Sequence, residues 1–344
     1  KRYQIQKVWR GERPQDGRFR EFTQADIDVV GLGELPFHYE VDLPLVMAEA
    51  LMSLPIPPVH VLVNNRKVVQ GVCEGIGVSD VESALRGLDK LDKIGPEGVR
   101  EELAEAGLSP EQIDILLRMA KIRTEDASRL QQEVAALGVS SETLDQGLTE
   151  LCALVDEANA AMPGVIIADL KIARGLDYYT GSVYESEIVG HEDLGSICSG
   201  GRYDSLAKDG KRTYPGVGLS IGVSRLVSRI LSQDMVSASR KVPTCVVIAV
   251  ADESERRHCN ALATILRRRG IPTDVAPSAA KFGKQIKFAD KRGIPFVWFP
   301  GSDGEADTVK DIRSGEQVEA DIYSWQPAEE DVRPAIRPTE EMDV

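Results

Sequence analysis

The 344-residue sequence has no long hydrophobic run and few cysteines. No apolar stretch approaches the roughly 18 residues of a membrane-spanning helix, and residues 1–14 contain no apolar core of a secretory signal. The five cysteines are odd in number and form no CxxC pair. This pattern disfavours a disulfide framework or a cysteine-bound metal and favours reduced thiols, so we expect a cytoplasmic protein.

The sequence also lacks an excess of basic residues. Its formal net charge of -14 argues against a general affinity for nucleic acid, because Lys and Arg dominate binding to phosphate backbones. The acidic excess is uneven, however, since residues 242–327 contain equal numbers of basic and acidic residues. A local positive patch is expected there if the following residues share one face: Arg267, Arg268, Arg269, Lys281, Lys284, Lys287, Lys291 and Arg292.

Histidines are scarce too. The chain contains only His38, His60, His191 and His258, and no two of them have the spacing of paired metal ligands. We therefore expect these histidines to be surface or packing residues, and we predict no protein-bound metal.

The order of the sequence patterns predicts more than one domain, as the length also does. Strand patterns in residues 1–78 and 162–233 bracket an almost entirely helical block at residues 79–161, which looks like an insertion. Strands then alternate with helices over residues 242–327, which predicts a separate small α/β domain. Residues 328–344 are acidic and interrupted by proline, so we expect them to be disordered.

Residues 10–28 carry the most informative local pattern. Arginines surround a polar PQDG turn, and the strand that follows places Gln24, Asp26 and Asp28 on alternate positions. Guanidinium groups suit the capture of phosphate, whereas carboxylate and amide oxygens suit a ligand's ammonium or ring N–H. The segment therefore predicts a phosphate site beside a cation site. An ordinary solvated hairpin is the alternative interpretation.

Further glycine-containing segments follow: RGLDYYTG at residues 174–181, SGGRYD at 199–204 and GVGLSIGVSRL at 216–226. Glycines in these segments allow a ligand to approach the main chain, although a glycine in a strand equally marks a bulge. Arg225 falls in the first turn of the helix that follows the last segment, where it is placed to meet phosphate oxygens. The glycines concerned are Gly200, Gly201, Gly216, Gly218 and Gly222.

Together these segments resemble a known family. The string WRGERPQDGRFREFTQADID resembles motif 2 of class II aminoacyl-tRNA synthetases in its histidyl form. ARGLDYYTG and SGGRYD resemble the two histidine-specific motifs of histidyl-tRNA synthetases, and GVGLSIGVSRL resembles class II motif 3. KFGKQIKFADKRGIPF is similar to part of that family's anticodon-binding domain. The resemblance extends to about Trp325.

The resemblance implies an α+β fold, in which a class II antiparallel sheet with a helical insertion is followed by an α/β anticodon-binding domain. It also implies ATP-dependent ligation of L-histidine to tRNA(His) through a histidyl adenylate, with Mg²⁺ held by the phosphates of ATP. The complete protein is expected to be a homodimer that does not bind membranes. Motif 1, which builds the family's dimer interface, is not in the sequence, so we expect weak or no activity from this fragment alone.

The resemblance assigns site residues position by position. Arg174 and Arg10 are the predicted catalytic residues, because a fixed cation stabilises the charge that grows on the α-phosphate oxygens. The predicted ATP-binding residues are Arg10, Glu12, Arg18 and Arg225. The predicted histidine-binding residues are Gln24, Asp28, Arg174, Tyr178 and Tyr179. Predicted tRNA contacts are Arg13, Gln15, Arg267, Arg268, Arg269 and Lys284.

Some alternatives stay open. Tyr178 and Tyr179 also fit plain core aromatics, and Ser224 stands where the family often has an acidic residue. A noncatalytic regulatory relative that senses histidine or tRNA is the main competing hypothesis. Such relatives lack the anticodon-binding domain and the ATP-binding arginines, whereas this chain has Arg10, Arg174 and Arg225. An unrelated two-domain ATP-binding protein does not explain RGLDYYTG together with GGRYD.

Overall fold

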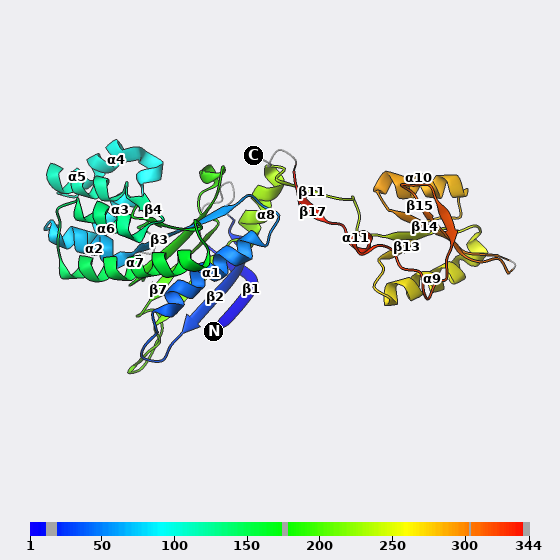
Figure 1. Cartoon of the computed structure of the whole chain (residues 1–344), viewed down its shortest axis with the longest axis horizontal. Helices are drawn as coiled ribbons and strands as arrows, with labels where there is room; N and C mark the ends of the chain where they lie inside the picture. Colours follow the sequence, from blue (N-terminus) through cyan, green and yellow to red (C-terminus); the bar gives the residue numbers. More distant parts are fainter. Residues whose placement is uncertain (12–18, 174–177, 303, 340–344) are drawn as a thin grey trace. The chain divides into compact units, whose positions relative to one another are not determined.

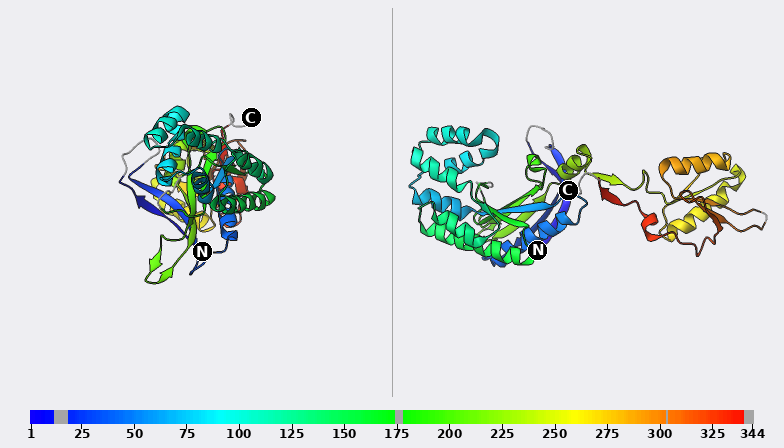
Figure 2. Two further views of the ribbon diagram at one scale, coloured as in Figure 1. Left: turned by 90° about the vertical axis from the view of Figure 1, so that its left-hand side faces the viewer. Right: turned by 45° about the horizontal axis from the view of Figure 1, so that its top comes forward.

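The chain forms two compact units, Lys1–Met235 and Val236–Val344. The computed structural model describes residues 1–11, 19–173, 178–302 and 304–339. Figures 1 and 2 show the ribbon, and each unit is described by itself below. Within the described residues, every helix is too short or too polar to cross a membrane.

An eight-stranded sheet forms the centre of the first unit. Its neighbouring strands are antiparallel except for the parallel pair β3 and β5. The sheet confirms the predicted class II-like architecture. In spatial order, the strands are β1 (Arg2–Trp9), β2 (Glu21–Val30), β10 (Gly216–Ile221), β7 (Cys198–Tyr203), β6 (Ser182–Ile188), β3 (Val59–Asn65), β5 (Ile166–Asp169) and β4 (Arg123–Thr124).

Helices α1 (His38–Met52) and α7 (Glu142–Ala161) run along one face of this sheet (Figure 2). Because side chains alternate between the two faces of a strand, residues such as Val29 are buried on the helix side. Gln24, Asp26 and Asp28 then point to the opposite face, as the alternation in the sequence predicts. Helix α8 (Val223–Ser232) follows β10 directly and packs against β2.

The remaining helices of the first unit gather at one end of the sheet (Figure 1). Helix α5 begins with the predicted capping box, in which the side chains of Ser109 and Gln112 satisfy each other's backbone N–H groups. Helices α2 and α7 approach so closely that a Cβ at Gly71 would lie 2.2 Å from the backbone nitrogen of Leu144. These helices are α2 (Arg66–Gly75), α3 (Val81–Leu88), α4 (Leu91–Glu105), α5 (Pro110–Met119) and α6 (Ala127–Ala135). Short elements complete the unit: η1 (Glu192–Leu194), β8 (Lys208–Asp209) and β9 (Arg212–Thr213).

The second unit is the predicted small α/β domain. In its five-stranded sheet, β12 lies between β13 and β14 and is parallel to both, whereas β15 and β16 are antiparallel additions. The connection from β12 to β13 and the connection from β13 to β14 run across the sheet in opposite directions. Because such crossovers are right-handed, α9 and α10 cover opposite faces (Figure 1). The elements are β12 (Val246–Ile248), η2 (Glu253–Glu255), α9 (Arg256–Arg268), β13 (Thr273–Val275), α10 (Phe282–Arg292), β14 (Phe296–Phe299), β15 (Thr308–Asp311) and β16 (Gln317–Glu319).

The expectation that residues 328–344 are disordered is wrong for residues 328–339. This segment contains α11 (Glu329–Val332) and β17 (Ile336–Pro338), which pairs with β11 (Val236–Ala238). The Arg240 guanidinium holds it by donating to the carbonyl oxygens of Asp331 and Val332, at 2.9 and 3.2 Å. The acidic composition of this segment suggested a solvated tail, but it did not reveal that Arg240 binds the backbone of the segment. Residues 340–344 lie outside the described residues.

Candidate active site

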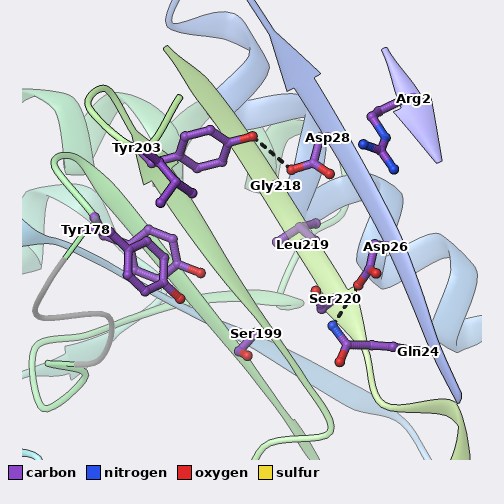
Figure 3. Close-up of a pocket in the computed structure, with 12 residues that line it drawn as sticks. Arg2, Gln24, Asp26, Asp28, Tyr178, Ser199, Tyr203, Gly218, Leu219 and Ser220 are labelled. Carbon is purple, nitrogen blue, oxygen red and sulfur yellow. Dashed lines mark hydrogen bonds between the residues drawn. The ribbon is translucent and has the colours of Figure 1, made fainter. Parts of the chain in front are cut away.

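A pocket of about 220 Å³ opens on the face of the first sheet that is opposite α1 and α7 (Figure 3). We call it the acidic pocket. It brings together Gln24 and Asp28 from β2 with Tyr178 and Tyr179, which lie 150 or more residues later in the chain. All of the predicted histidine-binding residues that the structure describes therefore line one cavity. Its other polar or charged side chains are those of Arg2, Asp26, Ser199, Tyr203 and Ser220.

The strand register explains why these side chains meet. Asp28 pairs with Gly218 on β10, and Gly218 pairs with Gly201 on β7, so that all three lie at one level of the sheet. A Cβ at Gly218 would lie only 2.2 Å from Asp28 Oδ1, and a Cβ at Gly216 would lie 2.4 Å from the ring of Tyr203. The sequence left open whether these glycines admit a ligand or serve the structure of the strand. In the structure, Gly216 and Gly218 make room for the pocket's own side chains.

Tyr203 is a site residue that the sequence analysis missed. Its hydroxyl donates a hydrogen bond to Asp28 Oδ1 at 3.0 Å (Figure 3). Burial raises the pKa of Tyr203, and the neighbouring Asp28 raises it further, so the phenol stays protonated and remains a donor. The sequence did contain a signal for this role, since alternation within SGGRYD places Ser199, Gly201 and Tyr203 on one face of β7.

The paired tyrosines close another side of the acidic pocket. The ring centroids of Tyr178 and Tyr179 are 4.3 Å apart, and Tyr178 is 43% exposed. Tyr179 packs against the strand at Gly201, where a Cβ would lie 2.9 Å from its ring. Burial raises the pKa of Tyr179, so this hydroxyl also stays protonated. The two rings therefore form a pocket wall, and Tyr178 is not the plain core aromatic that we considered.

Arg10 adjoins the acidic pocket at the end of β1. Its Nη2 lies 3.5 Å from Gln24 Oε1, and Gln24 in turn donates to Asp26 Oδ1 at 2.7 Å. The Arg10 guanidinium is exposed and lies over the ring of Phe22, 5.1 Å from its centroid. A cation that suits phosphate is thus placed beside acceptors that suit an ammonium or ring N–H.

The start of α8 is tied to the sheet and to a neighbouring turn. Ser224 Oγ accepts a hydrogen bond from the backbone N–H of Thr23 at 2.8 Å, which joins α8 to β2. Arg225 Nη2 donates to the carbonyl oxygen of Leu194 at 2.6 Å. The role of Ser224, left open by the sequence, is therefore to hold the helix that carries Arg225.

Several predicted residues cannot be placed. Five of them lie outside the described residues. They are Arg174, the predicted ATP contacts Glu12 and Arg18, and the predicted tRNA contacts Arg13 and Gln15. Among the residues that the structure does describe, no three His, Cys, Asp or Glu side chains are grouped to hold a metal ion.

The four basic residues predicted to bind tRNA in the second unit do not lie on one face. Arg267 Nε donates to the carbonyl oxygen of Thr273, and the Arg269 guanidinium donates to those of Ile322 and Trp325. These bonds tie the end of α9 to neighbouring segments, and Arg267 is exposed. Arg268 and Lys284 are exposed, but they belong to α9 and α10 on opposite faces of the sheet.

Comparison with known proteins agrees with this architecture. A model of the histidyl-tRNA synthetase family matches residues 3–226, and an anticodon binding domain model matches residues 244–324. The histidine–tRNA ligase of Micrococcus luteus is 57% identical over 340 residues, which cover 98% of this chain and 74% of that relative. The ligase of Cutibacterium acnes is 54% identical over 345 residues, which cover 98% of this chain and 76% of that relative.

A solved structure shows the same fold. The crystal structure of histidyl-tRNA synthetase from Nostoc sp. PCC 7120 aligns with a TM-score of 0.81 at 35% identity, and the match covers 93% of this chain and 75% of that one. The family models cover both units, and the relatives align over almost the whole chain. The chain belongs to the histidyl-tRNA synthetase family.

Proposed function

We propose that this protein catalyses the ATP-dependent ligation of L-histidine to tRNA(His). The observation that carries the proposal is the acidic pocket, where Asp28 and Gln24 lie beside Arg10 and the paired tyrosines. This arrangement supplies acceptors for a cationic, ring-bearing amino acid next to a cation for phosphate. The competing hypothesis of a noncatalytic regulatory protein is not favoured, because the relatives named above are ligases.

Asp28 is the residue that we expect to recognise the imidazole. Tyr203 binds one carboxylate oxygen, Oδ1, and thereby fixes the direction of the other. A ring N–H can donate to the other oxygen, whereas an analogue without the N–H leaves that oxygen without a partner from the ligand. Discrimination by a polar site of this kind reaches about 10⁴-fold, far more than an apolar pocket achieves.

The reaction has two steps. In the first, the histidine carboxylate attacks the α-phosphorus of ATP, the bond to the β-phosphate breaks and pyrophosphate leaves. Arg10 and Arg174 hold the α-phosphate oxygens, on which negative charge grows. In the second, a hydroxyl of the terminal tRNA ribose attacks the carbonyl carbon of the adenylate, and AMP leaves. We assign to Arg225 a contact with the outer phosphates of ATP. Its hydrogen bond to the Leu194 carbonyl oxygen would hold the guanidinium in place for this contact.

Magnesium enters this proposal with the nucleotide. Mg²⁺ prefers oxygen ligands, keeps several waters and is usually held through substrate phosphates. The described residues contain no ready-made carboxylate cage, so Mg²⁺ would neutralise phosphate charge while Arg10, Glu12, Arg18 and Arg225 hold the rest of ATP.

The domain roles are part of the same proposal. We assign the catalytic core to residues 1–78 and 162–233, the helical insertion to 79–161 and anticodon binding to 242–327. Arg13, Gln15, Arg267, Arg268 and Lys284 remain proposed tRNA contacts. We also propose that the complete protein works in the cytoplasm as a homodimer.

Histidine-dependent exchange between pyrophosphate and ATP tests the proposal directly. We expect the full-length gene product to catalyse exchange with histidine, and Arg174→Ala to lower its rate by about 10²-fold or more, the scale for losing a preorganised charge stabiliser. Arg86→Ala is the matched control, because Arg86 lies in α3 and its side chain is 55% exposed. Exchange that does not depend on histidine would refute the substrate, and full activity in Arg174→Ala would refute the role of Arg174.

A further inference from the structure

A network of charged side chains lies behind the acidic pocket, on the other face of β7. Because neighbouring residues of a strand point to opposite faces, Tyr203 faces the pocket and Arg202 faces α1. Arg202 Nη1 donates to Glu40 Oε1 at 2.6 Å and to the carbonyl oxygen of Leu35 at 3.3 Å. Arg202 Nε donates to Asp204 Oδ1 at 3.2 Å. We call Arg202, Glu40 and Asp204 the Arg202 network.

The Arg202 network contacts the three residues that follow the paired tyrosines: it makes hydrogen bonds to Thr180 and Ser182 and packs against Gly181. Thr180 donates its backbone N–H to the Arg202 carbonyl oxygen at 2.8 Å and its hydroxyl to Asp204. The backbone N–H of Ser182 donates to Glu40 Oε2 at 3.1 Å. Two side chains of the network, Glu40 and Asp204, thus bind the segment immediately after Tyr179 directly, and the Arg202 guanidinium binds both of them.

Gly181 shows how tightly this segment is seated. A Cβ at this position would lie 2.9 Å from Arg202 Cδ and 3.1 Å from Glu40 Oε2. No larger residue fits without moving the network. The backbone that leads out of Tyr179 is therefore packed directly on the two charged side chains.

The electrostatics explain why the network is rigid. The Glu40 residue is only 2% exposed, so its carboxylate depends on Arg202 and the Ser182 N–H for compensation. Burial by itself lowers the pKa of the Arg202 guanidinium, but the hydrogen bonds to Glu40 and Asp204 outweigh burial and raise it. Removing one member leaves a buried charge without its partner, which is costly, so the members hold one another in place.

We propose that Arg202, together with Glu40, is a positioning residue that sets the affinity of the acidic pocket for histidine. Its guanidinium orients Glu40 and Asp204, which hold Ser182 and Thr180 and so fix Tyr178 and Tyr179 on one side, while the strand of Arg202 carries Tyr203 on the other. Arg202 lies on the opposite face of the sheet from the pocket, so it acts through these residues and not by touching the substrate. The inference rests on the proposed function, because it names histidine as the ligand.

Arg202→Met and Arg202→Lys test this proposal in the full-length gene product. Exchange between pyrophosphate and ATP is measured while histidine and ATP are varied separately. We expect Arg202→Met to raise the KM for histidine by about 10-fold or more, because displacements of about 1 Å in a binding site are enough for such losses. The KM for ATP should change less than about 2-fold. Arg202→Lys should recover part of the loss, since an ammonium keeps the charge but lacks the planar fork that reaches Glu40 and Asp204 together.

Glu40→Gln is a second variant in case Arg202→Met does not fold. It keeps the size of the side chain and removes the charge, so it should raise the KM for histidine in the same direction. Arg123→Met is the matched control: Arg123 also bridges two carboxylates, Glu187 and Asp169, although its side chain is more exposed than that of Arg202, and it lies on β4 at the sheet edge. We expect it to lower stability and leave both KM values unchanged.

The outcomes separate the two proposals. If the unmodified protein shows no histidine-dependent exchange, the proposed function itself is wrong. If that exchange is present and the Arg202 and Glu40 variants keep the wild-type KM for histidine, the positioning role alone is overturned. A loss of stability with equal changes in both KM values, as a purely structural pair would give, overturns it as well.

Discussion

At the scale of single residues, Asp28 takes its position from Gly218. The two residues are paired across β2 and β10, and a Cβ on Gly218 would overlap Asp28 Oδ1 at 2.2 Å. The nearest atom belongs to a side chain and not to backbone, so Gly218→Ala should preserve the fold and displace the carboxylate. We expect the KM for histidine in pyrophosphate exchange to rise by about 10-fold or more.

Gly283→Ala is the matched control for Gly218→Ala. Gly283 lies in α10 of the second unit, and a Cβ there would meet nothing within 4 Å. Alanine also favours the helix, so this variant should keep the wild-type KM for histidine. If Gly218→Ala also kept it, Asp28 would not be the group that recognises the ring.

At the same scale, the sequence predicted which residues would meet but not how they are held. Gln24 and Asp28 were predicted from alternation and from the family motif, and both line the acidic pocket. Tyr203 was missed because an aromatic at the end of a strand usually packs in the core, and its partner Asp28 is distant in sequence. Arg267 and Arg269 were interpreted as part of a positive patch, and Arg267 is exposed, but a sequence does not show that Arg269 reaches the carbonyl oxygens of Ile322 and Trp325.

At the scale of elements, Glu253 joins η2 to the connection before α10. Its carboxylate accepts hydrogen bonds from Arg256 at 2.6 and 2.8 Å and from the backbone N–H of Ala279 at 2.9 Å. These bonds, with the Arg256 bonds as the larger cause, lower the pKa of Glu253 to about 2. The unfolded chain has a glutamate pKa of about 4.3. Folding therefore favours the charged form, and its stabilising effect is complete above about pH 4.3 and lost as the pH falls toward 2.

Glu253→Gln tests this linkage. We expect the free energy of unfolding of the second unit to fall at pH 6 and to match that of the unmodified protein near pH 2. Chemical denaturation at several pH values, followed by the fluorescence of the buried Trp298, gives both curves. Parallel curves over this range would mean that the carboxylate does not stabilise the loop. Glu316→Gln, at an exposed turn, is the control.

Element types were predictable along most of the chain because apolar periodicity and turn residues are local signals. The SPEQ start of α5 is one example, and the alternation in β2 is another. The pairing of β11 with β17 was not predictable, since each strand has only three residues and the contact joins distant segments. The same limit applies to Arg240, which orders α11 through main-chain carbonyl oxygens.

At the scale of the whole molecule, charge and chemistry are divided between the two units. Every described residue that we assign to histidine or ATP lies in Lys1–Met235, whereas the basic residues of α9 and α10 lie in Val236–Val344. Each unit has its own sheet, and the second has a core of its own around Val247, Leu266 and Trp298. The sequence predicted this division from a change in pattern near residue 240, but not the separation of the basic residues onto two faces.

This division predicts that adenylate formation and tRNA charging can be separated. Truncation of the full-length gene product after Met235 should keep histidine-dependent exchange within about 10-fold of the intact protein, because the residues that hold histidine and ATP remain. Charging of tRNA(His) should fall by about 10²-fold or more, since each lost base or phosphate contact costs about 1–3 kcal/mol and several are lost together. Exchange and charging are measured on the same preparations, with circular dichroism to verify folding. Equal losses in both assays would show that the second unit is needed for the first to work, and unchanged charging would move the tRNA-binding surface into the first unit.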